Sequence, residues 1–190
     1  MENTENNTKN NAIWMEIFEW VQAIVVAVVI AMFLRTYVFT LAYVDGDSMV
    51  PTLHNKDRLF VWRAGYSAQV DDIIIFRPKL HQDTPYVKRV IATEGQTIDI
   101  VPVEGKNYCE VYVDGNLVTE NFISAKINLS HKGDMKYPAV VPEDHVFAMG
   151  DNRNFSKDSR YKEVGMVSED SIIGKAVFRF FPFNQIGPLS

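Results

Sequence analysis

The sequence of 190 residues contains a single cysteine, Cys109, so no disulfide can form within the chain. Its four histidines, His54, His81, His131 and His145, are scattered without the spacing of metal ligands, and we expect neither a structural metal nor a cofactor. Lysine and arginine form no dense cluster and the formal net charge is -5. A concentrated basic surface is needed to bind phosphates, so nucleic acid is excluded as the main partner.

The sequence contains only one long apolar run. From Trp20 to Leu34 the only polar residue is Gln22. A helix over this run would span roughly 22 Å, short of the ~30 Å hydrocarbon core of a membrane. Extending it to Leu41, with the Arg35 side chain reaching the interface, gives about 33 Å, which is enough to cross.

Three interpretations of this run are open. A cleaved signal peptide is disfavoured, because the run is long and no basic region precedes it. A buried core helix is possible, because Glu16 and Glu19 precede the run like an acidic first turn. We favour a permanent membrane anchor over residues 13–41, preceded by a disordered tail of Asn, Glu and Thr over residues 1–12.

The charges around the run favour one orientation only weakly. Lys9 is the only basic residue before Trp20, whereas Arg35, Lys56 and Arg58 follow the run. Taken alone, the positive-inside rule would place the following domain in the cytoplasm.

Residues 42–190 have the pattern of a mainly β domain. Short β-rich runs, separated by turn residues, predict strands at 58–62, 72–76, 86–92, 97–101, 145–149 and 174–181. The run 72–76 is apolar enough to be buried on both faces. The clearest local pattern is a β-hairpin, in which residues 110–113 and 117–119 flank an Asp-Gly turn. Residues 120–139 are predicted to be an exposed loop, and about 102–141 to be a small insert.

A serine in a small turn follows the apolar run, within Asp45-Gly-Asp-Ser-Met-Val-Pro-Thr-Leu53. A serine nucleophile needs a base. No histidine precedes Ser48, so the trypsin-like order fails, and Val50 occupies the position where an α/β-hydrolase elbow needs glycine. Ser159-x-x-Lys162 matches one motif of penicillin-recognising enzymes, but its partner motifs are absent.

Lysine remains as a candidate base. Lys88 lies in an apolar predicted strand, although alternation turns most strand lysines to solvent. To act as a base near neutral pH its pKa must fall from about 10.4 to 7–8, which requires about 4 kcal/mol. Apolar burial can supply this much.

Four blocks, in order, resemble the type I signal peptidases, membrane-bound Ser-Lys proteases that remove signal peptides. The blocks are residues 46–53, 72–76, 86–95 and 150–160. Asp71 lies where the family commonly has glycine. Gly46 lies where many Gram-negative members have a serine that completes the oxyanion hole; together with the single anchor and the short insert, it resembles the Gram-positive, Bacillus-type branch.

The resemblance implies a role for each matching residue. Ser48 would be the nucleophile, with its own backbone N–H as an oxyanion donor, and Lys88 the general base. Ser156 would orient the lysine, and Asp158 and Arg160 would form a supporting ion pair. For Asp151, Asn152 and Arg153 we expect only a scaffold role. Pockets for small substrate side chains would be lined by Met49, Tyr86 and Val87.

The resemblance also implies partners and a location. The substrates would be signal peptides of exported preproteins, bound as an extended strand against Tyr43–Asp47 and Tyr86–Lys88. The anchor would lie in the cell membrane with a cytoplasmic N-terminus and an extracytoplasmic catalytic domain. The oligomeric state is not predicted. Three alternatives remain: a self-cleaving SOS-repressor-type Ser-Lys domain, a serine enzyme that uses His145, and a non-catalytic membrane-tethered β domain.

Overall fold

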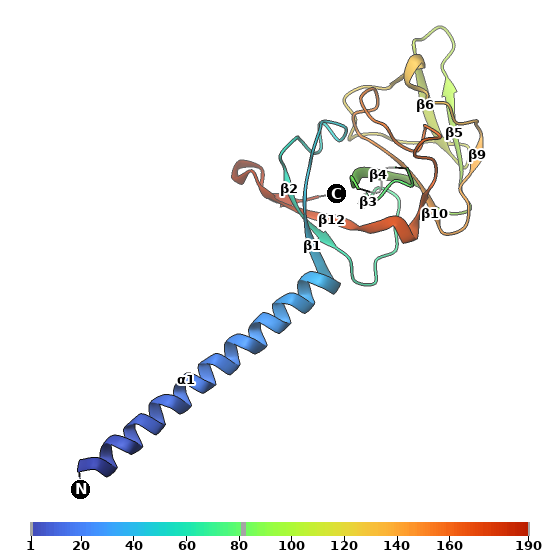
Figure 1. Ribbon diagram of the computed structural model, residues 1–190. Coiled ribbons are helices and arrows are strands. Elements are labelled where there is room, and N and C mark those ends of the chain that lie inside the picture. The colour runs from blue at the N-terminus through green and yellow to red at the C-terminus, as the bar shows by residue number, and fades with distance from the viewer. Residues whose placement is uncertain (1, 81–82, 190) are drawn as a thin grey trace. The chain divides into compact units, whose positions relative to one another are not determined.

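The protein is described from a computed structural model that covers residues 2–80 and 83–189, with side chains from residue 14 onward. Of the four histidines, His81 lies outside the described residues. The chain divides into two compact units, residues 1–39 and residues 40–190 (Figure 1).

The first unit is a single helix. α1 (Glu2–Phe33) is followed by a π-helical turn, η1 (Leu34–Val38). No glycine or proline occurs before Gly46, so the sequence contains no strong helix breaker. The helix therefore begins within the segment expected to be disordered. The predicted anchor, residues 13–41, extends too far at its C-terminal end, because its last three residues belong to strand β1 (Phe39–Tyr43).

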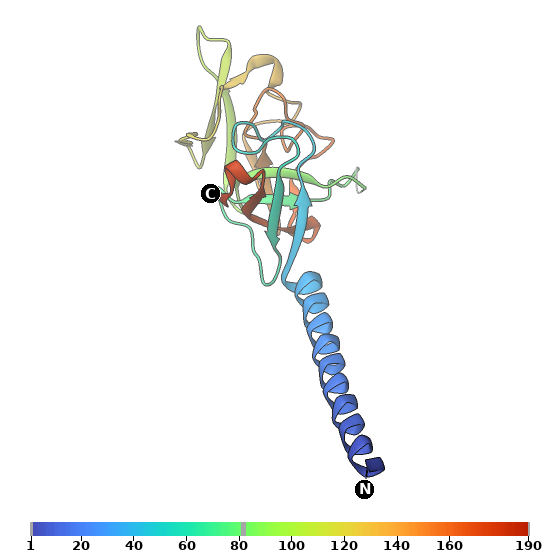
Figure 2. The same cartoon turned by 90° about the vertical axis from the view of Figure 1, so that its left-hand side faces the viewer.

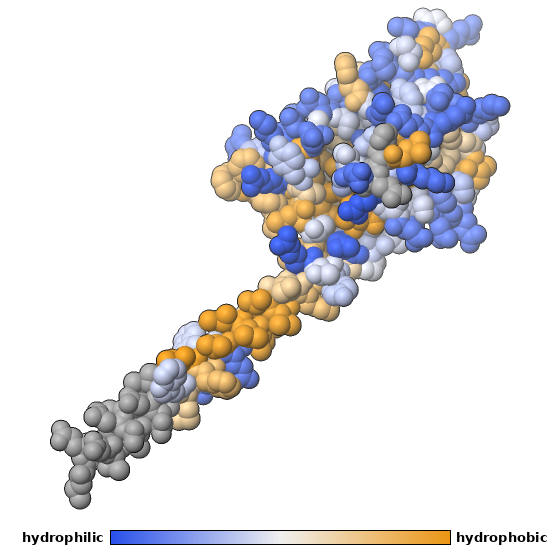
Figure 3. Space-filling view, viewed as in Figure 1, coloured by the Kyte–Doolittle hydropathy of each residue, from blue (hydrophilic) through white to orange (hydrophobic). Residues whose placement is uncertain are grey.

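Residues Trp14–Val38 form a segment that is long and apolar enough to cross a membrane. Its most apolar stretch of 18 residues has a mean hydropathy of 2.4, and the 25 residues of the segment correspond to about 37 Å of helix. None of it is buried within the protein, and Figure 3 shows an apolar surface along its middle with hydrophilic side chains toward its N-terminal end. The buried-core-helix interpretation is therefore wrong.

The second unit is mainly β, as the sequence predicted. Its larger sheet has eight strands in the order β1-β2-β12-β3-β4-β10-β11, with β13 paired to β12. Besides β1, these strands are β2 (Arg58–Trp62), β3 (Ile73–Phe76), β4 (Tyr86–Ala92), β10 (His145–Met149), β11 (Val167–Ser168), β12 (Ile172–Phe181) and β13 (Gly187–Pro188). The predicted strands in this sheet are present to within two residues at each end. β3 is buried along its whole length, as predicted.

A smaller sheet lies at one end of the second unit in both views (Figures 1 and 2). Its order is β7-β6-β5-β9, with β8 paired to β6. The strands are β5 (Thr97–Pro102), β6 (Tyr108–Val113), β7 (Asn116–Leu117), β8 (Ile127–Asn128) and β9 (Ala139–Val140). Asp114 and Gly115, which join β6 to β7, have φ values of 51° and 77°. Positive φ at both positions is the geometry of a type I′ turn, so the predicted hairpin is confirmed.

The small sheet is not an independent module. Ile98, Ile100 and Val111 on its inner face share one buried core with Ile91 of β4 and Phe147 of β10. The sheet also begins at Thr97, five residues before the predicted insert.

The expectation of an exposed loop over residues 120–139 is wrong in part. Ile127 is buried because β8 pairs with β6, and the Glu120 carboxylate is buried beside Arg153. Short helical turns occur at η2 (Leu129–His131), η3 (Glu169–Ser171) and η4 (Phe183–Gln185).

Candidate active site

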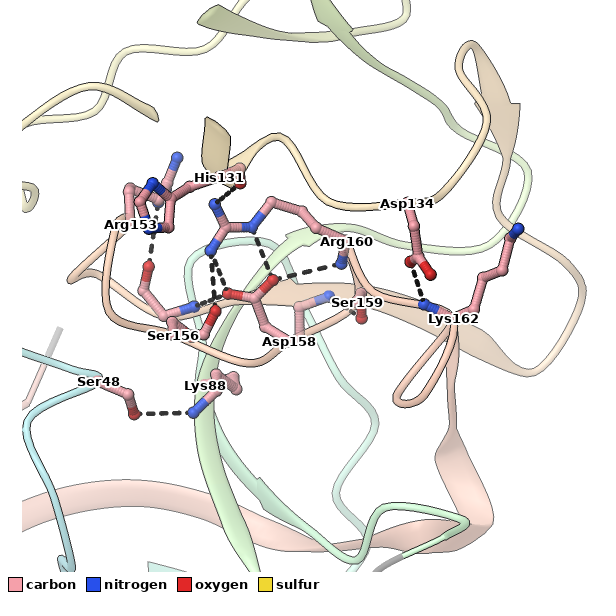
Figure 4. Close-up of polar contacts among 12 residues, drawn as sticks. Ser48, Lys88, His131, Asp134, Arg153, Ser156, Asp158, Ser159, Arg160 and Lys162 are labelled. Atoms are coloured by element: carbon pink, nitrogen blue, oxygen red, sulfur yellow. Dashed lines mark hydrogen bonds and ion pairs between the residues drawn. The ribbon is translucent and has the colours of Figure 1, made fainter. Parts of the chain in front are cut away.

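Ser48 and Lys88 lie next to each other in the second unit (Figure 4). Lys88 Nζ lies 2.8 Å from Ser48 Oγ. The serine lies in the connection between β1 and β2, and the lysine in β4, between β3 and β10 in the sheet. The fold therefore brings together the two residues that the sequence predicted to act as nucleophile and base.

Backbone hydrogen bonds and two buried apolar side chains stabilise the serine turn. Backbone N–H groups of Val50 and Leu53 donate to the carbonyls of Asp47 and Met49, at 3.2 Å and 2.9 Å. Met49 and Leu53 are fully buried in a core shared with β2 and β3. Ser48, the residue before Met49, is half-buried, and its hydroxyl faces the Lys88 amine.

The backbone explains why no side chain is present at Gly46. Its φ is +95°, a conformation that favours glycine. Its N–H donates to Asn55 Oδ1 at 3.2 Å. A Cβ would meet nothing within 4 Å, so backbone conformation and not crowding disfavours a serine here. Asp71 also has a positive φ, of 72°. Glycine adopts this conformation most readily, which explains why glycine is common at this position in the family that the sequence resembles.

Lys88 is buried in apolar surroundings. Only 4% of the residue is exposed, and its Nζ donates to Val87 O at 2.9 Å and lies 5.2 Å from the centre of the Tyr86 ring. Burial lowers the pKa of the Lys88 ammonium from 10.5 to about 8. The charge of Arg160 lowers this pKa further, whereas Asp158 and Asp151 raise it. A substantial fraction of the amine is therefore neutral near physiological pH.

The loop after β10 packs against the serine turn. Asn152 contacts the turn twice: its N–H donates to Ser48 O at 3.0 Å, and its Nδ2 donates to Asp47 O at 3.0 Å. Gly150 packs so tightly here that an added Cβ would overlap with Ser48 O and Ser156 Oγ. Gly150 thus permits a close approach that no other residue could make.

A buried ion pair fixes the other end of the turn. The Arg89 guanidinium donates to both oxygens of Asp151, at 3.0 Å and 2.9 Å, and to Asp71 O at 2.9 Å. Thr52 Oγ1 donates to Asp151 Oδ2 at 2.5 Å. Arg89 adjoins Lys88 in β4, so this pair ties the strand of the lysine to the turn of the serine. Asp151 and Asn152 thus hold the serine turn and β4 together, which is compatible with the expected scaffold role.

The expected ion pair between Asp158 and Arg160 is present and fully buried. The guanidinium donates to Asp158 Oδ1 and Oδ2, each at 2.8 Å (Figure 4). Burial alone would raise the pKa of the Asp158 carboxyl, but the charge and hydrogen bonds of Arg160 hold it below its usual value. Asp158 also accepts a bond from the Gly150 N–H at 3.0 Å.

Ser156 lies on the same loop, between Gly150 and Asp158 along the chain. Its hydroxyl is close enough to Asp158 to help lower the pKa of that carboxyl. It makes no hydrogen bond of standard geometry with any group in the described part of the chain. Its role in orienting Lys88 stays a prediction.

A cavity of about 210 Å³ opens beside Ser48 and Lys88. Met49, Tyr86 and Val87, the predicted pocket residues, all line it. A second cavity, of about 410 Å³, shares Tyr43, Asp45, Thr84, Pro85 and Val87 with the first and extends to Thr40 and Ile173. Together they form a groove that runs from the serine along β1.

Other candidate residues lie elsewhere. His145 lines a different cavity, with Phe76 and Val167, and its Nδ1 bonds to Glu143 O at 2.7 Å. Ser159 Oγ accepts a bond from Ala148 N–H at 3.1 Å, and Lys162 is exposed. Neither a histidine-based site nor the Ser-x-x-Lys motif is assembled among the described residues.

Sequence reasoning missed Arg89, Thr52 and the contacts of Asn152. Arg89 could have been found, because a second charge beside Lys88 in an apolar strand requires a buried partner. The bond from Thr52 to Asp151 joins residues 99 positions apart, and no local pattern indicates it.

Comparison with known proteins identifies the family of this chain. Residues 17–181 match the family model of signal peptidases, peptidase S26. Signal peptidase I S of Bacillus subtilis is 37% identical over 96% of this chain and 97% of its own length. A probable signal peptidase I-1 of Synechocystis is 41% identical over 93% of this chain and 88% of its own. A solved signal peptidase I from Enterococcus faecalis matches with a TM-score of 0.44 and 27% identity, over 58% of this chain and 97% of that one. The chain belongs to the signal peptidase family, peptidase S26.

Proposed function

We propose that this protease removes signal peptides from exported preproteins, with Ser48 as nucleophile and the neutral amine of Lys88 as general base. Family membership supports a signal-peptide-cleaving serine protease. One observation carries the assignment of residues, namely the buried Lys88 Nζ at 2.8 Å from Ser48 Oγ. That distance is within hydrogen-bond reach, as a base and its nucleophile require.

The proposed reaction is acyl transfer in two steps. Neutral Lys88 accepts the hydroxyl proton of Ser48 as Oγ attacks the scissile carbonyl, and the resulting ammonium gives that proton to the leaving amine. Water then attacks the acyl-enzyme, Lys88 accepts a proton from the water, and Oγ leaves as the hydroxyl. The backbone N–H of Ser48 is a proposed donor to the oxyanion, because Gly46 supplies no side chain.

The groove supports an extended substrate. Tyr43–Asp47 and Tyr86–Lys88 are the segments proposed to pair with it as neighbouring strands. The cavity beside the serine is small, and Met49, Tyr86 and Val87 line it, which fits the small residues of an Ala-x-Ala-type cleavage site.

We propose that Trp14–Val38 anchors the enzyme in the cell membrane, with its N-terminus in the cytoplasm and residues 42–190 outside. The apolar, unburied helix supports an anchor. The orientation rests on the proposed function, because signal peptides are removed after export, and it opposes the weak local charge bias. The lipid bilayer and the signal peptides of preproteins are then the partners.

Cleavage of a purified preprotein by the full chain in detergent tests this proposal. Wild type should process it, whereas Ser48→Ala and Lys88→Ala should lose almost all activity while keeping the wild-type circular dichroism spectrum. His145→Ala is the matched control and should remain active. Processing by either dyad variant at the wild-type rate would contradict the proposed roles.

The alternatives predict different outcomes of the same assay. A self-cleaving repressor-type domain would cut its own chain and leave the preprotein intact. A non-catalytic tethered domain would leave both intact.

A further inference from the structure

The groove beside Ser48 is asymmetric. Five residues line both cavities, and from there the second cavity extends to Thr40, Leu41 and Ile173. Lys157 lines only the cavity that contains Ser48 and Lys88. The groove is therefore long on the β1 side of the serine, and Lys157 lies outside that long part.

The long end suits the signal-peptide half of a substrate. Thr40 follows the membrane-spanning segment by two residues, so covalent geometry keeps it within about 7 Å of Val38, the end of that segment. The apolar part of a signal peptide lies in the same bilayer, so its cleavage-site residues should reach the serine along this end. The first residues of the mature protein must then leave outside that long part, where Lys157 lines the cavity.

Charged side chains line both parts of the groove, and the long part is lined by Arg63 and Arg77 as well as by Asp45. Asp45 lines the part that both cavities share, on the signal-peptide side. Lys157 supplies an exposed cation to the cavity that contains Ser48. An acidic side chain of the substrate that lies beside Lys157 would be attracted to it.

Lys157 is able to exchange its partner. The residue lies at an exposed part of the loop that binds the serine turn, and its Nζ is 3.3 Å from Glu163 Oε2. The side chains of this pair are 66% and 38% exposed. Exposed pairs of this kind contribute little, so a substrate carboxylate can replace Glu163 at small cost.

We propose that Lys157 binds an acidic side chain in the first two residues of the mature protein and so makes the enzyme prefer such preproteins. This inference rests on the proposed function, since it takes Ser48 as the point of cleavage.

Peptides that differ in one residue test it. The full chain in detergent is given internally quenched peptides with Ala-x-Ala before the scissile bond. Glu, Gln or Lys is placed at the first mature position in one series and at the second in another. In at least one series kcat/KM should fall from Glu to Gln to Lys, by about threefold at each step, the size expected for an exposed ion pair. Salt at 0.5 M should reduce these ratios, because it screens exposed charges.

Charge reversal identifies the residue responsible. Lys157→Glu should invert the order, and Lys157→Met should bring the ratios close to one. Lys162→Glu is the matched control, because Lys162 is exposed five residues further on and does not line the cavity. This control should keep the wild-type order.

Two results would overturn the inference: no preference in wild type in either series, or the wild-type order retained in Lys157→Glu. The proposed function fails separately, if Ser48→Ala still cleaves the Gln peptides.

Discussion

Cleavage should depend on pH through the Lys88 amine. The pKa of Lys88 is lowered from 10.5 to about 8, which corresponds to about 3 kcal/mol in favour of the neutral form. About a tenth of the enzyme then carries the neutral base at pH 7, half at pH 8 and nine tenths at pH 9. With an unperturbed lysine the neutral fraction at pH 7 would be roughly 300-fold smaller. Because only the neutral amine accepts the serine proton, activity must rise with pH.

The measurement is kcat/KM between pH 6 and pH 10 at constant ionic strength, with a quenched peptide that has no titrating side chain. Below pH 7 the rate should fall about tenfold for each pH unit, and above pH 9 it should be level. The acidic limb of kcat/KM reports the free enzyme, whose site is the one described. A midpoint near 6.5 would indicate a histidine, and one above 10 an exposed lysine. A flat profile down to pH 6 would refute the lysine base altogether.

Further outcomes follow from the packing around the dyad. Gly150→Ala should abolish preprotein cleavage, because its Cβ would overlap with Ser48 O, whereas Gly187→Ala, with open space, should be fully active. Lys88→Met should remove a pH dependence of stability. Between pH 8 and 10.5 the Lys88 amine is protonated in the unfolded state but neutral in the native state, so the free energy of unfolding of the wild type rises with pH. Measured by urea unfolding, this free energy should increase by about 2.5 kcal/mol from pH 7 to pH 10 relative to the variant. Asp158→Asn leaves Arg160 buried without a counter-charge and should lose about 3–5 kcal/mol in the same measurement.

Much of the fold follows from local patterns that the structure then satisfies. The Asp-Gly turn fixes the β6–β7 hairpin, because both positions take a positive φ. The apolar run of β3 specifies a strand covered on both faces. By contrast, the sequence predicts the first three residues of β1 as part of the anchor, because they continue the preceding apolar run and only pairing with β2 identifies them as a strand.

The candidate site was predictable in part. Alternation alone does not tell whether Lys88 faces solvent or the interior, and resemblance to a family resolved the question. The contacts of the 150–160 loop were not predictable, because they join side chains and carbonyls far apart in the chain. Asp151 illustrates this: it matches the family motif, yet its bonds to Arg89 and Thr52 appear only in three dimensions.

The bonds between the serine turn and the loop after β10 also bear on when the protease becomes active. The bond from Asn152 to Asp47 joins positions 105 residues apart, and that from Thr52 to Asp151 joins positions 99 apart. Contacts of such long range are made late in folding, because the intervening chain must be ordered first. A growing chain would display Ser48 long before residues 150–160 exist to hold it. The enzyme should therefore be inert throughout its own synthesis and gain activity only when its last quarter has folded.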